Sequence, residues 1–192
     1  MKIGIDARLW NESGVGRYIR NLVTQLQEID KKNEYILFHL THDKKDIESI
    51  VTNSNFHLRI ANIRWHSVEE QLSIPGILAR ENLDLVHFPY FSVPIFYTGT
   101  FVVTIHDLIL NHYPTGQAST LPSFVYYLKL LGYKFVVREA ARKARHIIAV
   151  SKETKKRLSI AAFFCYARSN TITLPSSGES AAVLGGKEVF NL

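Results

Sequence analysis

Apolar residues along the chain follow two alternating spacings, which predict alternating strands and helices. Short runs of β-branched and aromatic residues predict strands over 2–7, 34–40, 56–60, 84–88, 101–105 and 146–150. Apolar residues at helical spacing predict a helix over 14–29, and further helices are expected over 44–51, which is short and polar, 68–80 and 119–144. Ser151 is placed to cap a further helix, and the run 171–174 is a candidate seventh strand.

This order of elements predicts the fold class. Repeated strand–helix units favour an α/β fold with a parallel sheet, and right-handed crossovers then place helices on both faces in a Rossmann-like layout. No interdomain linker is visible before residue 158, and we expect a single domain over 1–175. Residues 176–192 show no periodicity and are expected to form an irregular C-terminal tail.

The composition is that of an ordinary globular protein. Of the 192 residues, 46% are hydrophobic and 21% are charged, so a substantial core can form. Cys165 is the single cysteine, which excludes an intrachain disulfide and is typical of a reducing compartment. The N-terminus lacks the apolar segment of a signal peptide, and the apolar stretch 88–105 is interrupted by two prolines and a glycine. We therefore expect a cytoplasmic protein that is not integral to a membrane.

The net charge of +6 comes largely from cations in two segments, 129–145 and 152–157. We favour solvated helix faces over a patch that binds phosphates or anionic lipid heads. Aromatic residues interleave with cations over 124–138, which suits weak peripheral membrane contact and equally suits a helix packed on the sheet; we favour packing. No nucleic-acid recognition motif accompanies the charge, so nucleic acid is not an expected partner.

A titratable pair stands at the end of the fifth predicted strand. The run 101–105 has the character of a buried central strand, and His106 and Asp107 follow it directly. Ligands of open α/β sheets bind at the carboxyl ends of the strands. His106 and Asp107 are therefore candidate catalytic residues. A core histidine bonded to the backbone and an acid that caps the next segment are the alternative interpretations.

Two glycines open the first predicted helix. Exposed N–H groups beside Gly14 and Gly16, together with the guanidinium of Arg17, form a candidate phosphate site. A tight turn and helix–sheet packing explain the glycines equally well. Ile19 occupies the third glycine position of a dinucleotide-binding G-x-G-x-x-G motif, and the loop before Gly14 is long for that motif. A dehydrogenase is therefore disfavoured.

Two more polar residues lie at strand ends: His87 is near the end of the strand predicted over 84–88, and Ser151 follows the one over 146–150. Parallel strands would bring both to the same edge as His106. For His87 we favour a packing role. We expect no metal site, because His39 and His42 have no cysteine pair nearby and no Asp-x-Asp motif occurs.

Five motifs resemble, in the same order, those of the family 4 retaining glycosyltransferases: 4–8 (GIDAR), 14–18 (GVGRY), 87–90 (HFPY), 103–108 (VTIHDL) and 147–151 (IIAVS). The likeness covers about residues 1–158. The part of these two-domain GT-B enzymes that the chain resembles is the N-terminal, acceptor-side domain, especially that of mannosyltransferase-like members. The resemblance implies transfer of a hexose, with mannose as a candidate, from a nucleotide sugar to a glycan or lipid-linked acceptor.

The resemblance also implies roles for the candidate residues. Four of them would bind near the donor diphosphate and the acceptor: Gly14, Gly16, Arg17 and Ser151. His106 corresponds to the histidine that lies beside the transferred sugar in these enzymes and stabilises charge or orients hydroxyls. Asp107 corresponds to the acid that follows that histidine. The leaving diphosphate would accept the proton of the acceptor hydroxyl, and no cofactor is implied.

Family members carry a second Rossmann-like domain with a Glu-x7-Glu motif. Here no glutamate has another glutamate eight positions later. We therefore expect half of an enzyme, truncated and inactive alone, because catalysis needs both walls of the cleft. Two alternatives remain: a non-catalytic subunit whose partner chain supplies the missing domain, and a dinucleotide-binding Rossmann protein.

Overall fold

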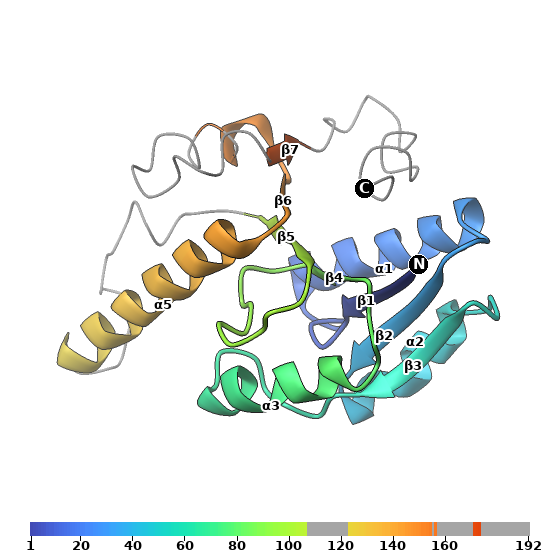
Figure 1. The fold of residues 1–192 in the computed structure, drawn as a ribbon, viewed down its shortest axis with the longest axis horizontal. Coiled ribbons are helices and arrows are strands. Elements are labelled where there is room, and N and C mark those ends of the chain that lie inside the picture. Colours follow the sequence, from blue (N-terminus) through green and yellow to red (C-terminus); the bar gives the residue numbers. More distant parts are fainter. Residues whose placement is uncertain (107–122, 155, 157–170, 174–192) are drawn as a thin grey trace.

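The computed structural model describes residues 1–106, 123–154, 156 and 171–173. Its strands are β1 Lys2–Asp6, β2 Glu34–His39, β3 Phe56–Ile60, β4 Leu85–Phe88, β5 Phe101–Ile105, β6 His146–Ala149 and β7 Thr171–Thr173. Its helices are α1 Ser13–Ile29, the 3-10 turn η1 Thr41–Asp43, α2 Lys44–Ile50, α3 Val68–Ala79 and α5 Ser123–Lys143. Figure 1 shows these elements in sequence colours.

The strands form one sheet in the order β3-β2-β1-β4-β5-β6-β7, and every neighbouring pair is parallel. The predicted Rossmann-like layout is therefore confirmed. The sequence runs outward from β1 to β3 and then returns to the other side of β1 with β4. This reversal makes the carboxyl ends of β1 and β4 the switch point at which ligands of open α/β sheets bind.

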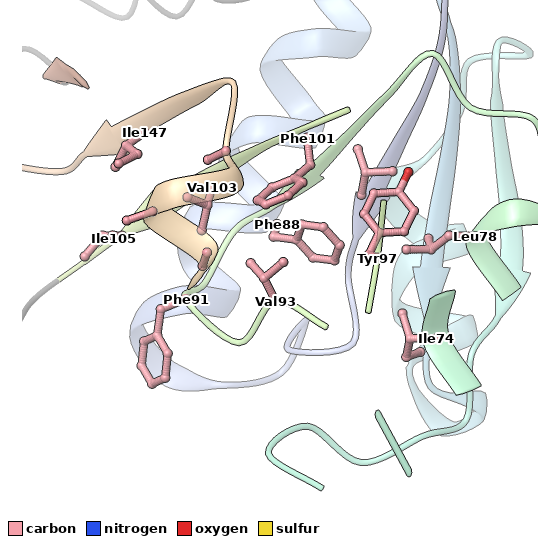
Figure 2. Close-up of a cluster of buried hydrophobic side chains, with 14 of the residues drawn as sticks. Ile74, Leu78, Phe88, Phe91, Val93, Tyr97, Phe101, Val103, Ile105 and Ile147 are labelled. Atoms are coloured by element: carbon pink, nitrogen blue, oxygen red, sulfur yellow. The ribbon is translucent and has the colours of Figure 1, made fainter. Parts of the chain in front are cut away.

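Two hydrophobic cores lie on opposite faces of the sheet. One face packs against α1 and α2, where Ile19 and Ile47 join Ile5 of β1. The other face packs against α3 and α5, and Figure 2 shows Phe88 and Phe101 at its centre. Burial of each such side chain contributes about 1.5–3 kcal/mol. The helices therefore cover both faces, as the sequence predicts.

Successive side chains along β4 and β5 point to opposite faces of the sheet, and this determines where the polar residues of these strands lie. Phe88 and Val103 belong to the core beneath α5. Successive strand residues point to opposite faces, so His87 and Thr104 point toward α1. Both side chains are fully buried. A polar pair is therefore held inside the sheet directly below the carboxyl edge.

Several sequence predictions concern parts of the chain beyond the described residues. Asp107, the start of the helix predicted from residue 119, and the tail 176–192 all lie outside them. The candidate seventh strand is confirmed as β7, which pairs with β6. Among the described residues, no helix combines the length and the apolar character needed to cross a bilayer.

Candidate functional site

His106 stands directly after β5 and is half-buried at the carboxyl edge of the sheet. Its Nε2 atom lies 2.9 Å from the carbonyl oxygen of Pro89, in the connection that follows β4. A carbonyl oxygen can only accept, so Nε2 carries the proton and donates it. In the neutral ring Nδ1 then holds the lone pair. The bond to Pro89 ties the ends of the two central strands together.

The ring of Tyr18 supports His106 from the side of α1. The two rings are 5.3 Å apart between centroids and nearly perpendicular, at 86°. The hydroxyl of Tyr18 lies 3.1 Å from Oγ1 of Thr104, on β5. Burial raises the pKa of Tyr18 to about 12, so its phenol stays protonated. Tyr18 therefore links the glycine-containing end of α1 to His106.

His87 completes this network beneath the surface. Its Nε2 atom lies 2.8 Å from Oγ1 of Thr104, while Nδ1 has no hydrogen-bond partner among the described residues. Burial, reinforced by the charge of nearby His106, lowers the pKa of His87 to about 3. His87 is thus a neutral, fully buried side chain, which confirms the packing role favoured from the sequence.

The two glycines of α1 differ in their surroundings. A Cβ on Gly16 would lie 2.2 Å from the carbonyl oxygen of Trp10, so close packing of the preceding loop explains that glycine. A Cβ on Gly14 would meet no heavy atom within 4 Å. Packing therefore does not account for Gly14, which is exposed, as is Arg17 one turn later.

The start of α1 presents an uncompensated positive end. Glu12 precedes the helix but makes no side-chain capping bond, and the fully described first turn contains no acidic residue. Orphan N–H groups and the helix dipole favour an anion at such a terminus. The guanidinium of Arg17 adds a formal positive charge at the same end.

A buried ion cluster lies at the end of β1. Arg8 is 2% exposed, and its Nε and Nη2 atoms donate to the two carboxylate oxygens of Asp6 over 2.8 and 2.6 Å. Nη2 also donates to Oε1 of Glu70 over 2.7 Å. Burial by itself lowers the pKa of Arg8, but the two carboxylates outweigh it and raise that pKa. The guanidinium is therefore permanently charged.

Glu70 is fully buried in the first turn of α3 and connects three segments. Its Oε2 atom accepts from the hydroxyl of Ser92 over 2.7 Å and from the backbone N–H of His66 over 2.9 Å. Its own N–H donates to Oγ of Ser67, the N-cap of α3, over 3.0 Å. No pattern in the sequence predicts this cluster. The Ser67-x-x-Glu70 spacing indicates a helix start but gives no sign of the partner Arg8, which follows β1.

A small hollow opens above this cluster. It is lined by Asp6, Arg8, Leu9, Trp65, Glu70, Pro89, Tyr90 and Ser92. The Tyr90 ring lies 6.4 Å from that of His106, between centroids. Pro89 both lines the hollow and accepts the hydrogen bond of His106. The hollow and His106 therefore belong to one continuous region at the β1–β4–β5 edge.

Ser151 follows β6 and caps the next helix, as predicted. Its Oγ atom accepts from the N–H of Thr154 over 3.0 Å. The hydroxyl of Thr154 in turn donates to the carbonyl oxygen of His106 over 3.2 Å. Ser151 is therefore connected to His106 through one intervening residue. Of the candidate residues, only Asp107 lies outside the described part of the chain.

The described residues contain no group of three or more His, Cys, Asp or Glu side chains arranged to hold a metal ion. What they bring together is a positive helix start, a half-buried histidine and a polar hollow with aromatic walls. All lie along one edge of a parallel sheet. The fold is Rossmann-like, and this edge includes the switch point, where ligands of open α/β sheets bind.

Comparison with known proteins identifies the family. The model of Glycosyltransferase Family 4 matches residues 13–161, well over half of the chain. The chain therefore belongs to glycosyltransferase family 4. No curated protein matches it significantly.

A structural likeness agrees with this assignment. The apo form of the lipopolysaccharide outer core galactosyltransferase WaaB is similar with a TM-score of 0.53 at 14% sequence identity. The likeness covers 90% of this chain and 44% of the galactosyltransferase chain, so the present chain spans less than half of that protein. At this identity the likeness concerns the fold, which is that of a GT-B half-domain.

Proposed function

We propose that this chain forms the acceptor-side wall of a glycosyltransferase active site, and that a hexose is transferred at the edge around His106. The observation that carries the proposal is the link from α1 to β5 through Tyr18, whose ring contacts His106 and whose hydroxyl is bonded to Thr104. A nucleotide sugar carries a diphosphate beside its sugar, and these two groups match the positive start of α1 and the adjacent His106.

Each candidate residue then has a physical role. Gly14 allows close approach of a diphosphate to the backbone of α1, and Arg17 contributes a charge-assisted bond to it. His106, whose Nε2 proton is held by Pro89, orients sugar hydroxyls or stabilises developing charge and does not act as a strong base. Asp107 would orient the segment after His106, and Ser151 supports His106 through Thr154.

The proposal includes a second Rossmann-like domain, either on a longer form of this polypeptide or on a separate chain. That domain would hold most of the nucleotide sugar and close the cleft, because transfer requires both walls. The chain alone is then an incomplete enzyme. Sedimentation of the purified chain with candidate partners distinguishes a two-chain enzyme, in which a stable complex forms, from a single longer polypeptide.

Diphosphate binding tests the proposal on the chain itself. Inorganic diphosphate added to the ¹⁵N-labelled protein should shift the amide signals of Gly14 and its neighbours, with a dissociation constant of about 1 mM or weaker. Arg17→Ala should weaken binding about tenfold. Lys32→Ala is the matched control, because it removes an equally exposed charge beyond the other end of α1. Equal effects of the two substitutions would contradict the proposal.

The identity of the hexose belongs to the same proposal. The motifs resemble mannosyltransferase-like members, while the structural neighbour WaaB is a galactosyltransferase. We propose a hexose donor and favour mannose. Competition between GDP-mannose and UDP-galactose in a complex completed by the donor-binding domain decides between the two.

A further inference from the structure

We propose that Ser92 and Glu70 act as a positioning pair for His106. Their hydrogen bond holds the connection between β4 and β5, residues 89–100, so that the carbonyl oxygen of Pro89 stays in place to receive the Nε2 proton of the imidazole. This inference rests on the proposed function, which places the transfer beside His106. It assigns a role at that site to a buried carboxylate of α3.

The connection between β4 and β5 contains no helix or strand, yet much of it is buried. Pro89 and residues 91–94 are buried, and Ser92 is only 6% exposed. Polar groups inside a protein require partners, and an irregular segment has no ladder of its own to supply them. The conformation of the connection therefore depends on its contacts with other elements.

Glu70 anchors the connection from the first turn of α3. Oγ of Ser92 donates to Oε2 of Glu70 over 2.7 Å, and the N–H of His66 donates to the same oxygen over 2.9 Å. The second oxygen, Oε1, accepts from Nη2 of Arg8 over 2.7 Å. A charged acceptor strengthens each of these bonds, and a buried network with its members satisfied specifies one arrangement. The Glu70 carboxylate is therefore a fixed point for Ser92.

The bond from His66 to Glu70 restrains the two residues that separate Pro89 from Ser92. His66 has a φ of 58°, a left-handed conformation that side chains rarely adopt. In this conformation its ring lies against the rings of Tyr90 and Phe91, with centroid separations of 5.7 and 5.3 Å. Glu70 thus restrains this part of the connection twice, directly at Ser92 and through His66.

The far part of the connection is held independently of Ser92. The N–H of Ile95 donates to Oε1 of Gln71 over 2.8 Å, and Nζ of Lys143 donates to the carbonyl oxygen of Ile95 over 2.6 Å. Val93 belongs to the hydrophobic core on this face of the sheet (Figure 2). Loss of the Ser92 hydroxyl should therefore loosen the part nearest Pro89 while the rest of the connection stays in place.

Pro89 carries the effect of the pair to His106. Its carbonyl oxygen lies 2.9 Å from Nε2, and the hydrogen bond at one ring nitrogen determines which of the two nitrogens bears the proton. A displaced carbonyl would leave both neutral forms of the ring accessible and would let the ring turn. Ser92 and Glu70 therefore act on the imidazole through Pro89, which makes them positioning residues.

Two serines that both bond to Glu70 allow a matched test. Ser92→Ala removes the anchor of the connection. Ser67→Ala is the control, because Oγ of Ser67 accepts from the N–H of Glu70 and caps α3 without contributing to the connection. The readout is the ¹⁵N NMR signals of the His106 ring in the full chain at a pH of about 8, where an ordinary histidine is neutral.

Wild-type His106 should show a protonated Nε2 whose proton is protected from exchange with water. In Ser92→Ala the proton should be shared between Nε2 and Nδ1, and the Nε2 proton should exchange about tenfold faster. In Ser67→Ala the His106 signals should stay at their wild-type positions, although the loss of the cap lowers the stability of α3. Ser92→Thr keeps a hydroxyl on the same carbon and should restore the wild-type signals.

Contrary results separate this inference from the proposed function. Unchanged His106 signals in Ser92→Ala, equal changes in Ser67→Ala, or a larger change in Ser92→Thr than in Ser92→Ala overturns the inference, even when diphosphate binds near Gly14. A change specific to Ser92→Ala in a chain that does not bind diphosphate near Gly14 supports the positioning pair and contradicts the proposed transferase role.

Discussion

Arg8 and Glu70 are 62 positions apart in the sequence, yet their buried side chains meet in an ion pair of 2.7 Å. The pair fastens the end of β1 to the start of α3. Removal of one partner leaves the other charge inside the protein without compensation, which costs far more than the loss of a surface pair.

Arg8→Met should therefore lower the free energy of unfolding by about 3–5 kcal/mol. Arg59→Met is the matched control, because Arg59 pairs with Glu81 at the surface with 49% of its side chain exposed. The control should cost less than about 1 kcal/mol. Urea unfolding of both variants measures the difference. Similar losses would show that the buried cluster does not hold β1 to α3.

The glycines of α1 give a second prediction. Gly16→Ala should destabilise the protein by about 1–3 kcal/mol, because the added Cβ collides with the backbone of Trp10. Gly14→Ala has open space around it and should be neutral or stabilise by up to about 1 kcal/mol, since alanine favours the helix. Thermal unfolding of the two variants provides the comparison, and the reverse order of stability would contradict the assignment.

The buried histidine predicts a pH dependence. The pKa of His87 is about 3 in the folded protein against 6.5 for an exposed histidine. Between these two pKa values the unfolded chain binds a proton that the folded chain does not bind. The free energy of unfolding therefore falls as the pH is lowered through this range. From pH 7 to pH 5 the loss due to His87 is about 2 kcal/mol.

His87→Gln should remove that part of the pH dependence, whatever its effect on stability at pH 7. His57→Gln is the control for the substitution itself, since the His57 side chain is 44% exposed and lies outside the buried network. Urea unfolding at the two pH values measures both. A wild-type slope that persists in His87→Gln would assign the titration to another group.

Tyr18 should position His106 through its ring rather than through its hydroxyl. Tyr18→Phe loses the bond to Thr104 at a cost of about 1 kcal/mol but keeps the edge contact with His106. Tyr18→Leu loses both. The ring signals of His106 in NMR spectra should therefore stay near their wild-type positions in the first variant and move in the second. Movement of equal size in both would mean that the hydroxyl does the positioning.

Much of the fold follows from local patterns in the sequence. The strand 101–105 and the helix that begins near Gly14 are predicted by runs of apolar residues whose spacing repeats every two or every three to four positions. The same patterns place His106 and Ser151 on one edge, because parallel strands end together. The cap formed by Ser151 also follows from its position before a helix.

The polar contacts between distant elements could not be predicted in this way. Nothing near Glu70 indicates that its carboxylate meets Arg8, because the pairing depends on how α3 crosses the end of β1. The bond between His87 and Thr104 likewise requires the register of β4 against β5, which no local pattern specifies. The small hollow beside Arg8 and Glu70 depends on the same long-range contacts, so no local pattern predicts it either.

The most direct measurement is a titration of the isotope-labelled chain with GDP-mannose and UDP-galactose, monitored at the amide of Gly14 and the ring of His106. We expect one of these nucleotide sugars to shift both signals together, with a single weak dissociation constant of about 1 mM, and Arg17→Ala to weaken both responses equally. Binding that leaves His106 unperturbed, or no response at Gly14 with either nucleotide sugar, would contradict a sugar-transfer site at this edge of the sheet.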